Sequence, residues 1–418
     1  MVKKTFVLIL FLVLFGGITL PVQAQEYTQQ TNLYRTNEQS SIDTSSFYFD
    51  FYGKKIFGRF FKDSVRKPIS TFYSQAVTIQ KKLSGTLFNL PNQTSSSTNE
   101  KPIRLSFAGD AMMDWSVKET IKQKGPDYPF VQIKEELQSS DLSVVNLETS
   151  ITSGGTKQGK QYTFRSDPIA LTGLKNAGFQ LVSLANNHSL DYGQTGFTDT
   201  LANLHQYQLD YVGGGHNREE AYKAGTYSLN GKTVKILAFS KVLPDYSWVA
   251  TDSKPGLANG YDLNLIEKTI QIEKADADFL FVFIHWGVEK NRTPEPFQRE
   301  WARGIIDAGA DGVIGSHPHV LQGFEYYKNK PIAYSLGNFL FPDYIKGNAA
   351  QTGILHLDLD ENHIKMTFVP FLISQDQIVS QSEQEKSVIW KELQGLSYGG
   401  LTILNGEIVE QTTLAETN

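Results

Sequence analysis

From Lys101 onward, short runs of apolar residues recur along the chain, and each run leads to a side chain that can bind a metal ion or move a proton. The runs are RLSFA, LSVVNL, LVSLA, FLFVFI, GVIG and IAYSL. Continuous apolar runs of this kind are typical of strands buried on both faces. Segments with apolar residues at helical spacing, such as 168–177 and 193–208, lie between them. The alternation predicts an α/β domain.

The polar residues that follow the six runs carry the functional information. In chain order they are Asp110, Glu148, Asn187, His188, His285, Glu289, His317, His319 and Asn338. In α/β sheets the loops at the carboxyl ends of the strands converge, so these side chains are expected to meet in one cleft. Carboxylate, imidazole and amide groups without sulfur suit Mn, Fe, Zn or Mg. The sequence therefore predicts a divalent-metal site, and two such ions could activate a water and neutralise a phosphate or a carboxylate.

Each motif also has a purely structural explanation when it is taken alone. A Gly-Asp pair after a strand is common in turns and helix caps, Asn-Asn-His could be a polar turn, and His285 before Trp286 could be a packed core histidine. Ser-His-Pro-His at 316–319 is the most specific signal, because two imidazoles on either side of a proline have few structural reasons to exist. Arg165 is a candidate contact for an anion, although a surface arginine explains it equally well.

The composition excludes several classes of function. The formal net charge is -5 and no broad basic patch appears, which argues against nucleic acid as a partner. An anionic ligand would therefore need positive charge supplied locally, by an ion or by single arginines and lysines. The chain has no cysteine, which excludes disulfides, thiolate metal sites, a cysteine nucleophile and a lipid-modified cysteine.

The first residues have the pattern of a targeting segment. Lys3 and Lys4 precede the apolar run 6–20, and Pro-Val-Gln-Ala follows, so residues 1–24 are predicted to be a signal peptide. An uncleaved membrane anchor is the alternative, although the run is slightly short of the roughly 20 apolar residues that span a bilayer. Both predict that the bulk of the chain is exported, and lies in the medium or at the cell surface.

The rest of the chain divides into three parts that differ in composition and in hydrophobic pattern. Residues 25–100 form a leader and linker that contains the aromatic and basic stretch 47–61, which could pack on the main domain or lie on a membrane surface. Residues 101–373 form the α/β domain, which ends in short alternating strands. Residues 374–418 are predicted to be a C-terminal tail rich in Gln and Glu.

Six segments between about Ile103 and Phe341 resemble motifs of the CapA family, bacterial capsule synthesis proteins associated with poly-γ-glutamate. In the family's order they are GDAMM (109–113), NLE (146–148), LANNHSLDYG (184–193), HWGVE (285–289), GSHPHVLQ (315–322) and YSLGNFLF (334–341). The family is similar to the calcineurin-like metallophosphoesterases. The resemblance implies a four-layer α-β-β-α metallophosphoesterase-like sandwich, with an N-terminal leader and a small C-terminal β-containing extension.

The resemblance also implies roles for the polar residues. The metal ligands would be Asp110, Glu148 in the place of the bridging carboxylate, Asn187 as an amide ligand, His285, His317 and His319. His188 would be the general acid, and Arg165, Glu289 and Asn338 are candidates for substrate contact.

One position departs from the pattern. Phosphoesterases usually carry Asp-x-His at the first motif, and here Met112 stands in the place of the histidine. A thioether is a poor ligand for these hard metals. One of the two metal sites is therefore expected to be weaker, or the chemistry to differ.

Two functions from different classes follow. The first is a metal-dependent hydrolase or transferase outside the cell, in which metal-activated water attacks a phosphoester or amide-type bond of a capsule or wall polymer and His188 protonates the leaving group. The second is a non-catalytic component that binds an anionic polymer such as poly-γ-glutamate, or membrane-bound capsule synthase components, and assists export and attachment. An extracellular metallophosphatase unrelated to capsule is a third alternative.

Overall fold

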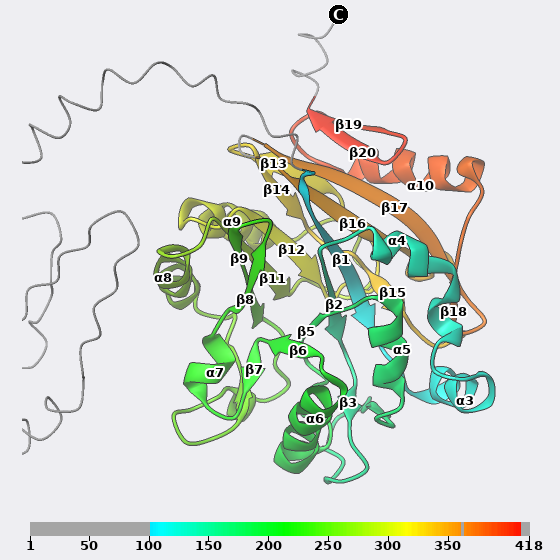
Figure 1. The fold of residues 1–418 in the computed structure, drawn as a ribbon, viewed down its shortest axis with the longest axis vertical. Helices are drawn as coiled ribbons and strands as arrows, with labels where there is room; N and C mark the ends of the chain where they lie inside the picture. The colour runs from blue at the N-terminus through cyan, green and yellow to red at the C-terminus, as the bar shows by residue number, and fades with distance from the viewer. Residues whose placement is uncertain (1–100, 361–362, 411–418) are drawn as a thin grey trace, which may run out of the picture. The chain divides into compact units, whose positions relative to one another are not determined.

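Two β-sheets packed face to face form the centre of the structure, a computed structural model that describes residues 101–360 and 363–410 (Figure 1). The predicted signal peptide or anchor, the leader with its aromatic stretch 47–61 and the last residues of the predicted tail lie outside the described residues. Within the described ranges, no helix combines the length and the apolar character that crossing a membrane requires.

The first sheet has ten strands, with a parallel half and an antiparallel half. The parallel half consists of β1 (Ile103–Ala111), β2 (Leu142–Leu147), β5 (Leu181–Ser183) and β6 (Asp210–Val212), in that order, with β15 (Asn338–Leu340) also parallel to β1. The antiparallel half continues from β1 through β16 (Gln351–Leu359), β17 (Ile364–Ser374), β20 (Glu407–Glu410) and β19 (Leu401–Leu404), with β18 (Gln377–Val379) on β17.

The second sheet has six strands and is parallel in its centre. Its order is β13 (Phe324–Tyr327), β14 (Lys330–Ala333), β12 (Gly312–Ser316), β11 (Phe279–His285), β9 (Lys232–Ser240) and β8 (Gly225–Leu229). β14, β12, β11 and β9 run parallel, and the edge strands β13 and β8 are antiparallel to their neighbours.

Apolar side chains from both sheets fill the space between them. The ring centroid of Phe107 on β1 lies 6.2 Å from the centroids of both Phe281 and Phe283 on β11. Because side chains alternate along a strand, the next residue, Ala108, faces the opposite side of the first sheet and joins a second apolar cluster there. Each sheet is therefore buried on both faces, as the continuous apolar runs predict.

Helices cover the two outer faces and complete four layers (Figure 1). The first sheet is covered by α3 (Trp115–Lys124), η5 (Tyr128–Ile133), α4 (Lys134–Gln138), α5 (Ala170–Ala177) and α6 (Gly193–Tyr207). The second sheet is covered by α8 (Leu263–Lys274) and α9 (Pro296–Asp307), and α7 (Arg218–Tyr222) lies at its edge. The predicted α-β-β-α sandwich is confirmed.

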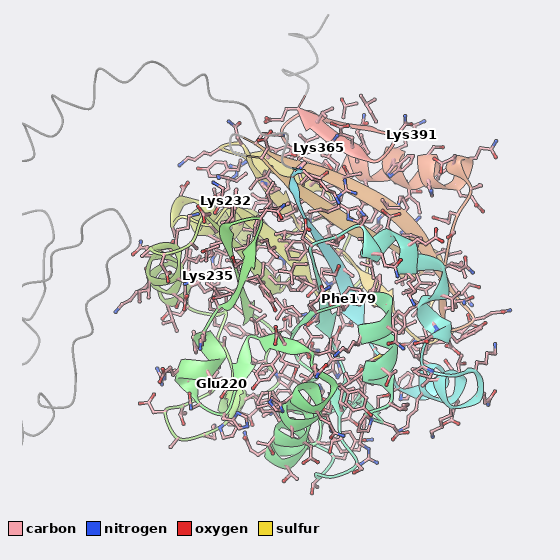
Figure 2. The ribbon with its side chains drawn as sticks, in the orientation of Figure 1. Phe179, Glu220, Lys232, Lys235, Lys365 and Lys391 are labelled. Carbon is pink, nitrogen blue, oxygen red and sulfur yellow. The ribbon has the colours of Figure 1, made fainter. Side chains whose placement is uncertain are left out.

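Two residues labelled in Figure 2 illustrate the division between interior and rim. Phe179, just before β5, is fully buried, and its ring contacts Phe339 of β15 edge-on at 5.4 Å. Lys235 on β9 instead extends its ammonium group to Glu273 at 2.7 Å and Asp276 at 2.6 Å. The lysine stem is buried while its charge is satisfied at the end of α8.

The segment that follows Ser374 was set apart from the domain in the sequence analysis. It contributes strands to the first sheet and a helix that packs against that sheet. Its helix α10 (Glu383–Leu396) begins with a capping box in which Ser382 and Glu385 satisfy each other's backbone amides. Ile389, Trp390 and Leu393 of α10 join the cluster between the sheets. The Trp390 indole also donates to the carbonyl of Phe368 on β17 at 2.9 Å.

The carboxyl ends of the parallel strands of both sheets lie at the same edge of the sandwich (Figure 1). Near this edge β1 runs directly beside the Leu336–Gly337 backbone, and the amide of Asp110 donates to the carbonyl of Gly337 at 2.9 Å. A Cβ atom at Gly109 would lie 2.0 Å from that carbonyl oxygen, so only glycine fits there. The Gly-Asp pair therefore lets β1 present Asp110 at the sheet edge.

Candidate metal centre

Polar side chains from both sheets meet at this edge. Asp110 is near the end of β1, Glu148 follows β2, His285 ends β11 and His317 follows β12. Potential ligand atoms lie within 4.8 Å of one another in three overlapping groups, namely Glu148 with His285 and His317, Asp110 with Glu148 and His319, and Glu289 with His317 and His319. The structure thus brings together the carboxylates and imidazoles that the sequence analysis selected.

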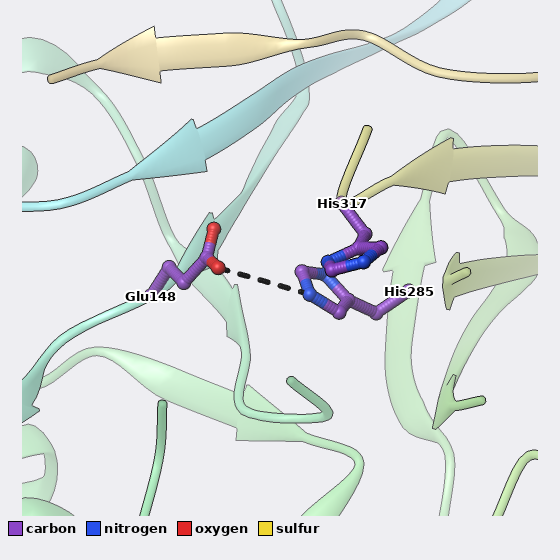
Figure 3. A group of neighbouring side chains, drawn as sticks. All are labelled: Glu148, His285 and His317. Atoms are coloured by element: carbon purple, nitrogen blue, oxygen red, sulfur yellow. Dashed lines mark ion pairs between the residues drawn. The ribbon is translucent and has the colours of Figure 1, made fainter. Parts of the chain in front are cut away.

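Glu148 is the most unusual of these residues. It is fully buried, and neither of its carboxylate oxygens has a hydrogen-bond partner among the described residues. Figure 3 shows it facing the two imidazoles, with Oε1 at 3.8 Å from Nε2 of His285. Burial, followed by repulsion from Asp110, raises the pKa of Glu148 well above its usual value. A buried carboxylate without a donor is costly unless a cation compensates it.

The imidazoles around Glu148 are poor sources of that compensating charge. Burial lowers the pKa of His285 well below its usual value, and burial also lowers the pKa of His317 to about 3. Both rings are therefore neutral near pH 7 and have nitrogen lone pairs to offer. The Nδ1 atom of His317 also has no partner among the described residues. Neutral imidazoles are the form in which histidine binds metal ions.

Asp110 is oriented by two hydrogen bonds. Its Oδ1 accepts from Nδ2 of Asn146 at 2.8 Å, and its Oδ2 accepts from the backbone amide of His317 at 3.0 Å. Its Oδ2 also lies 3.5 Å from Nδ1 of His319. Burial is the main reason that the pKa of Asp110 is raised, and the neighbouring imidazole and hydrogen bonds oppose it. The carboxylate is thus fixed toward the centre of the cluster.

His285 links the two sheets at the centre. Its Nδ1 lies 2.8 Å from Oγ of Ser316 on the neighbouring strand, and its Nε2 lies 2.8 Å from Oδ1 of Asn187. Asn187 follows β5 of the first sheet, so this contact bridges the two halves of the site. Hydrogen bonds of this kind set the tautomer and the orientation of a metal-binding histidine.

The Ser-His-Pro-His segment has a strained backbone. His317 and His319 have φ values of 96° and 57°, a region that residues with a side chain rarely adopt. The segment is held by Asn338, whose Oδ1 lies 2.9 Å from Nδ1 of His319 and whose Nδ2 donates to the carbonyls of His319 and Ala349. The side chain of Asn338, a candidate for substrate contact, is thus engaged in positioning His319. Such strain is typical of functional sites.

His188 lies on the first-sheet side of the cluster. Its Nδ1 is 2.7 Å from Oδ2 of Asp191, and its Nε2 is 3.9 Å from Oε1 of Glu148. The ring stacks on Phe164, with centroids 4.1 Å apart. Burial lowers the pKa of His188, and Asp191 acts in the opposite direction. Asp191 therefore holds the ring so that Nε2 faces the site.

Lys160 is a further charged residue next to His188. Its ammonium group donates to Oδ1 of Asp191 at 2.7 Å and to the carbonyl oxygen of Asn187, and lies 3.3 Å from Nδ1 of His188. Burial lowers the pKa of Lys160, and Asp191 opposes that shift. Lys160 supplies positive charge close to the cluster.

The sequence analysis selected neither Lys160 nor Asp191. Lys160 lies in an irregular segment between β3 (Ser150–Ile151) and β4 (Arg165–Ser166), where the sequence has no periodic pattern. Asp191 is three residues after His188 in the motif LANNHSLDYG, and that short spacing was an available signal.

Three further residues that the sequence analysis singled out, Arg165, Glu289 and Met112, differ in their contacts and burial. The guanidinium of Arg165 lies over the ring of Tyr192, 4.4 Å from its centroid. Glu289 is exposed and lies at the open side of the group with His317 and His319. Met112 is fully buried in an apolar cluster with Phe164 and Phe341.

The donor set fits a hard or borderline divalent cation. It combines neutral imidazoles with buried carboxylates and an amide oxygen, and it contains oxygen and nitrogen atoms that no hydrogen bond satisfies. The residues that could hold the ion are Asp110, Glu148, Asn187, His285, His317 and His319.

Comparison with known proteins identified similar sequences. A family model described as "Bacterial capsule synthesis protein PGA_cap" matches residues 104–343. The capsule biosynthesis protein CapA of Bacillus anthracis is 37% identical over 250 residues, which are 58% of this chain and 60% of the relative. The PGA biosynthesis protein CapA of Bacillus subtilis is 36% identical over 239 residues, 56% of this chain and 62% of the relative. The chain thus matches less than two thirds of either relative's length.

Among solved structures, the NAD nucleotidase of Haemophilus influenzae aligns with a TM-score of 0.40 and 12% sequence identity. The alignment covers 71% of this chain and 57% of that chain.

Proposed function

Because the chain belongs to the PGA_cap family of bacterial capsule synthesis proteins, we propose that it takes part in the synthesis, export or surface attachment of capsular poly-γ-glutamate. The names of the two Bacillus relatives support this role. We further propose that the protein acts outside the cytoplasm, since residues 1–24 have the pattern of a signal peptide or anchor. Poly-γ-glutamate, and membrane-bound capsule synthase components, would be its partners.

The chemistry that we propose for the site depends on one observation, the buried Glu148 carboxylate, which has no hydrogen-bond partner within residues 101–360 and 363–410 and faces neutral imidazoles. Asp110, Glu148, Asn187, His285, His317 and His319 would hold a divalent cation. When bound, such an ion supplies positive charge for an anionic group and acidity for a coordinated water. This would let a protein with a net charge of -5 hold a polymer carboxylate or a phosphate.

The chain's own residues would handle the proton. Asp191 accepts the Nδ1 hydrogen of His188, which leaves Nε2 facing the site. The lowered pKa of His188 makes the ring neutral in the free protein. A bound anion beside the ring would favour its protonated form, so His188 would become a general acid when the substrate is present.

A second candidate function is metal-dependent binding of the polymer without catalysis. The packing of Met112 in an apolar cluster favours it, since the residue that would complete a second metal site in phosphoesterases is replaced and turned to other contacts. A single ion would suffice to hold polymer carboxylates. The two candidates share the metal centre and differ only in turnover.

The experiment is a comparison of four proteins for metal content, turnover and polymer binding. Wild type, Glu148→Gln, His188→Asn and the control His205→Ala, an exposed residue of α6, would be purified and loaded with Mn²⁺ or Zn²⁺. Turnover would be measured on bis-p-nitrophenyl phosphate and on poly-γ-glutamate, and polymer binding by calorimetry. Elemental analysis would give the bound metal.

The catalytic proposal predicts that His188→Asn retains metal and loses turnover by about 100-fold or more, as removal of a general acid does. Glu148→Gln should lose both metal and turnover, and His205→Ala should retain both. Absence of turnover with metal-dependent polymer binding would support the binding function instead. Wild-type protein that takes up no divalent metal would refute both, and phosphodiester turnover without any poly-γ-glutamate response would point to a phosphatase unrelated to capsule.

A further inference from the structure

An exposed group of aromatic rings adjoins the metal centre. Trp115 at the start of α3, Tyr162 before β4 and Tyr344 after β15 are 41%, 52% and 59% exposed, respectively. The ring of Trp115 contacts those of Tyr162 at 6.3 Å and Tyr344 at 5.5 Å. We call these three residues the aromatic platform. Large aromatic side chains gathered at the surface usually mark a binding site.

The aromatic platform is continuous with the residues of the centre. Trp115 contacts Phe164 edge-on at 5.4 Å, and Phe164 stacks on His188 at 4.1 Å. Phe341, which contacts Phe164, also lies 5.0 Å from the ring of His319. Only two ring contacts therefore separate Trp115 from the proposed general acid.

The backbone at Trp115 supports a role in binding. Trp115 has a φ of 52°, which is unfavourable for a bulky side chain. The carboxylate of the preceding residue, Asp114, accepts a hydrogen bond from the backbone amide of Arg165 at 2.8 Å, which ties the start of α3 to β4. The chain thus retains a strained backbone that presents a half-exposed indole next to the site, which packing of the core does not require.

The shape and polarity of the aromatic platform indicate the ligand. The ring of Trp115 meets that of Tyr162 at 61° and that of Tyr344 at 44°, so the indole forms no parallel wall with either tyrosine that would sandwich a flat base. The exposed rings instead offer an open face bordered by phenolic hydroxyls. The Tyr344 hydroxyl has no hydrogen-bond partner among the described residues, and that of Tyr162 accepts from Gln161 at 3.2 Å, which leaves its own hydrogen free. A pyranose ring has matching chemistry, with an apolar face of C–H groups and an edge of hydroxyls.

We propose that the aromatic platform binds a sugar ring of a glycan, so that the group processed or held at the metal centre is attached to a glycan or lies next to one. This inference rests on the proposed function for the presence of a metal centre. Poly-γ-glutamate itself has no ring and carries a carboxylate on every residue, so it offers nothing for the aromatic platform to stack on. The platform would thus recognise the neighbouring glycan of a capsule or wall polymer.

The test is titration of the full chain with chitotetraose, an uncharged oligosaccharide, while the tryptophan emission is recorded. Trp115 is the most exposed tryptophan, since Trp248, Trp286 and Trp390 are buried and Trp301 is half-buried, so a ligand on the aromatic platform should shift the emission and protect it from acrylamide. The titration would be run with EDTA and with Mn²⁺. Poly-γ-glutamate binding would be measured separately on the same samples.

Tyr344→Ala should weaken chitotetraose binding about 10-fold while the protein stays folded, because the residue is largely exposed. Trp115→Phe should weaken binding less and abolish the emission change, and Tyr261→Ala, an exposed tyrosine near α8, should have no effect. Failure of wild type to bind, equal binding by Tyr344→Ala, or a stronger response to AMP than to the oligosaccharide would overturn the inference. Glycan binding that persists with EDTA, in protein that takes up no metal, would refute the proposed metal-dependent function. The aromatic platform would still be supported as a glycan-binding site.

Discussion

Glu148→Gln should make the metal-free protein more stable and should also abolish its stabilisation by metal. In the wild type, a fully buried carboxylate has no donor for either oxygen in the part of the chain that the structure describes, and the nearest ring nitrogen of His285 is 3.8 Å away. Glutamine has nearly the same shape and carries no charge. Removing an unsatisfied buried carboxylate should therefore stabilise the metal-free fold by about 1–3 kcal/mol.

The pH dependence of the free energy of unfolding should show that the Glu148 carboxylate destabilises the metal-free fold. Burial and repulsion from Asp110 raise the pKa of Glu148 above its usual 4.5, so the unfolded chain gives up this proton at a lower pH than the folded chain. As the pH rises above about 4.5, the metal-free wild type loses stability until the folded pKa is passed. The variant has no such loss. The difference between the two proteins should therefore vanish below about pH 4 and grow as the pH rises above about 4.5.

Metal should offset this difference in stability. At a free ion concentration of 100 times Kd, binding to the native state alone adds about 2.7 kcal/mol to the wild type. For a folded unit of this size, one kcal/mol changes Tm by about 2–4 °C. In EDTA, the variant should therefore melt roughly 2–10 °C above the wild type, and in saturating Mn²⁺ the wild type alone should gain a comparable amount.

Differential scanning calorimetry at pH 7.5, with EDTA and with MnCl₂, would measure both effects. Glu219→Gln, at an exposed position of α7, is the matched control and should follow the wild type in every condition. The reasoning would be refuted by a variant that melts below the wild type in EDTA. It would also be refuted if Mn²⁺ raised the Tm of both proteins equally, because Glu148 would then not belong to the site.

Three further predictions concern other parts of the chain. Asp191→Asn should reduce phosphodiester turnover about 10- to 100-fold and shift its pH profile while the metal content is unchanged, because His188 loses the carboxylate that lies 2.7 Å from its Nδ1. An unaltered pH profile would contradict the role of Asp191 in positioning His188. Gly109→Ala should lower the Tm by roughly 5 °C or more, because the new Cβ would lie 2.0 Å from a backbone carbonyl oxygen; a variant as stable as the wild type would show that β1 can move away. Glu136→Gln should cost about 1 kcal/mol or less at pH 7, since the side chain is 32% exposed and bonds Nε2 of His356 at 2.8 Å. Because the pKa of Glu136 is lowered from its usual 4.5, chiefly by that bond, the cost should shrink in urea titrations as the pH falls below about 4.5, and a difference that grows there would refute the assignment.

The strand ends could be predicted from the sequence because they depend on local pattern. The run FLFVFI followed by His285 is strand β11, and GVIG followed by Ser316 is β12, with the polar residue at the carboxyl end in both cases. The run IAYSL was less accurate, since β14 ends at Ala333 and the chain turns before β15 begins at Asn338. No strand was predicted for 232–240, although β9 lies there at the centre of the second sheet.

The partners of each functional side chain could not be predicted, since they come from elsewhere in the chain. Lys160 reaches Asp191 across 31 residues, and Asn146 reaches His285 across 139. Likewise, the role of Asn338 in holding His319 depends on how β15 lies beside β1. A periodic pattern reports which face of a strand is buried, but carries no information on which strand lies next to it.

By itself, the sequence determined the alternation of buried strands and helices, and which polar residues stand at the strand ends, because both follow from hydrophobic periodicity within a few residues. It also determined family membership, because the motifs occur in order along residues 104–343. Only the tertiary structure decided that Glu148 is buried without a hydrogen-bond partner among the residues it describes, and that Met112 packs in an apolar cluster. It also decided that Trp115 is half-exposed and is linked to His188 through the ring of Phe164. Burial and hydrogen bonding at these residues depend on contacts between strands and loops that are distant in the chain, and a local pattern cannot specify such contacts.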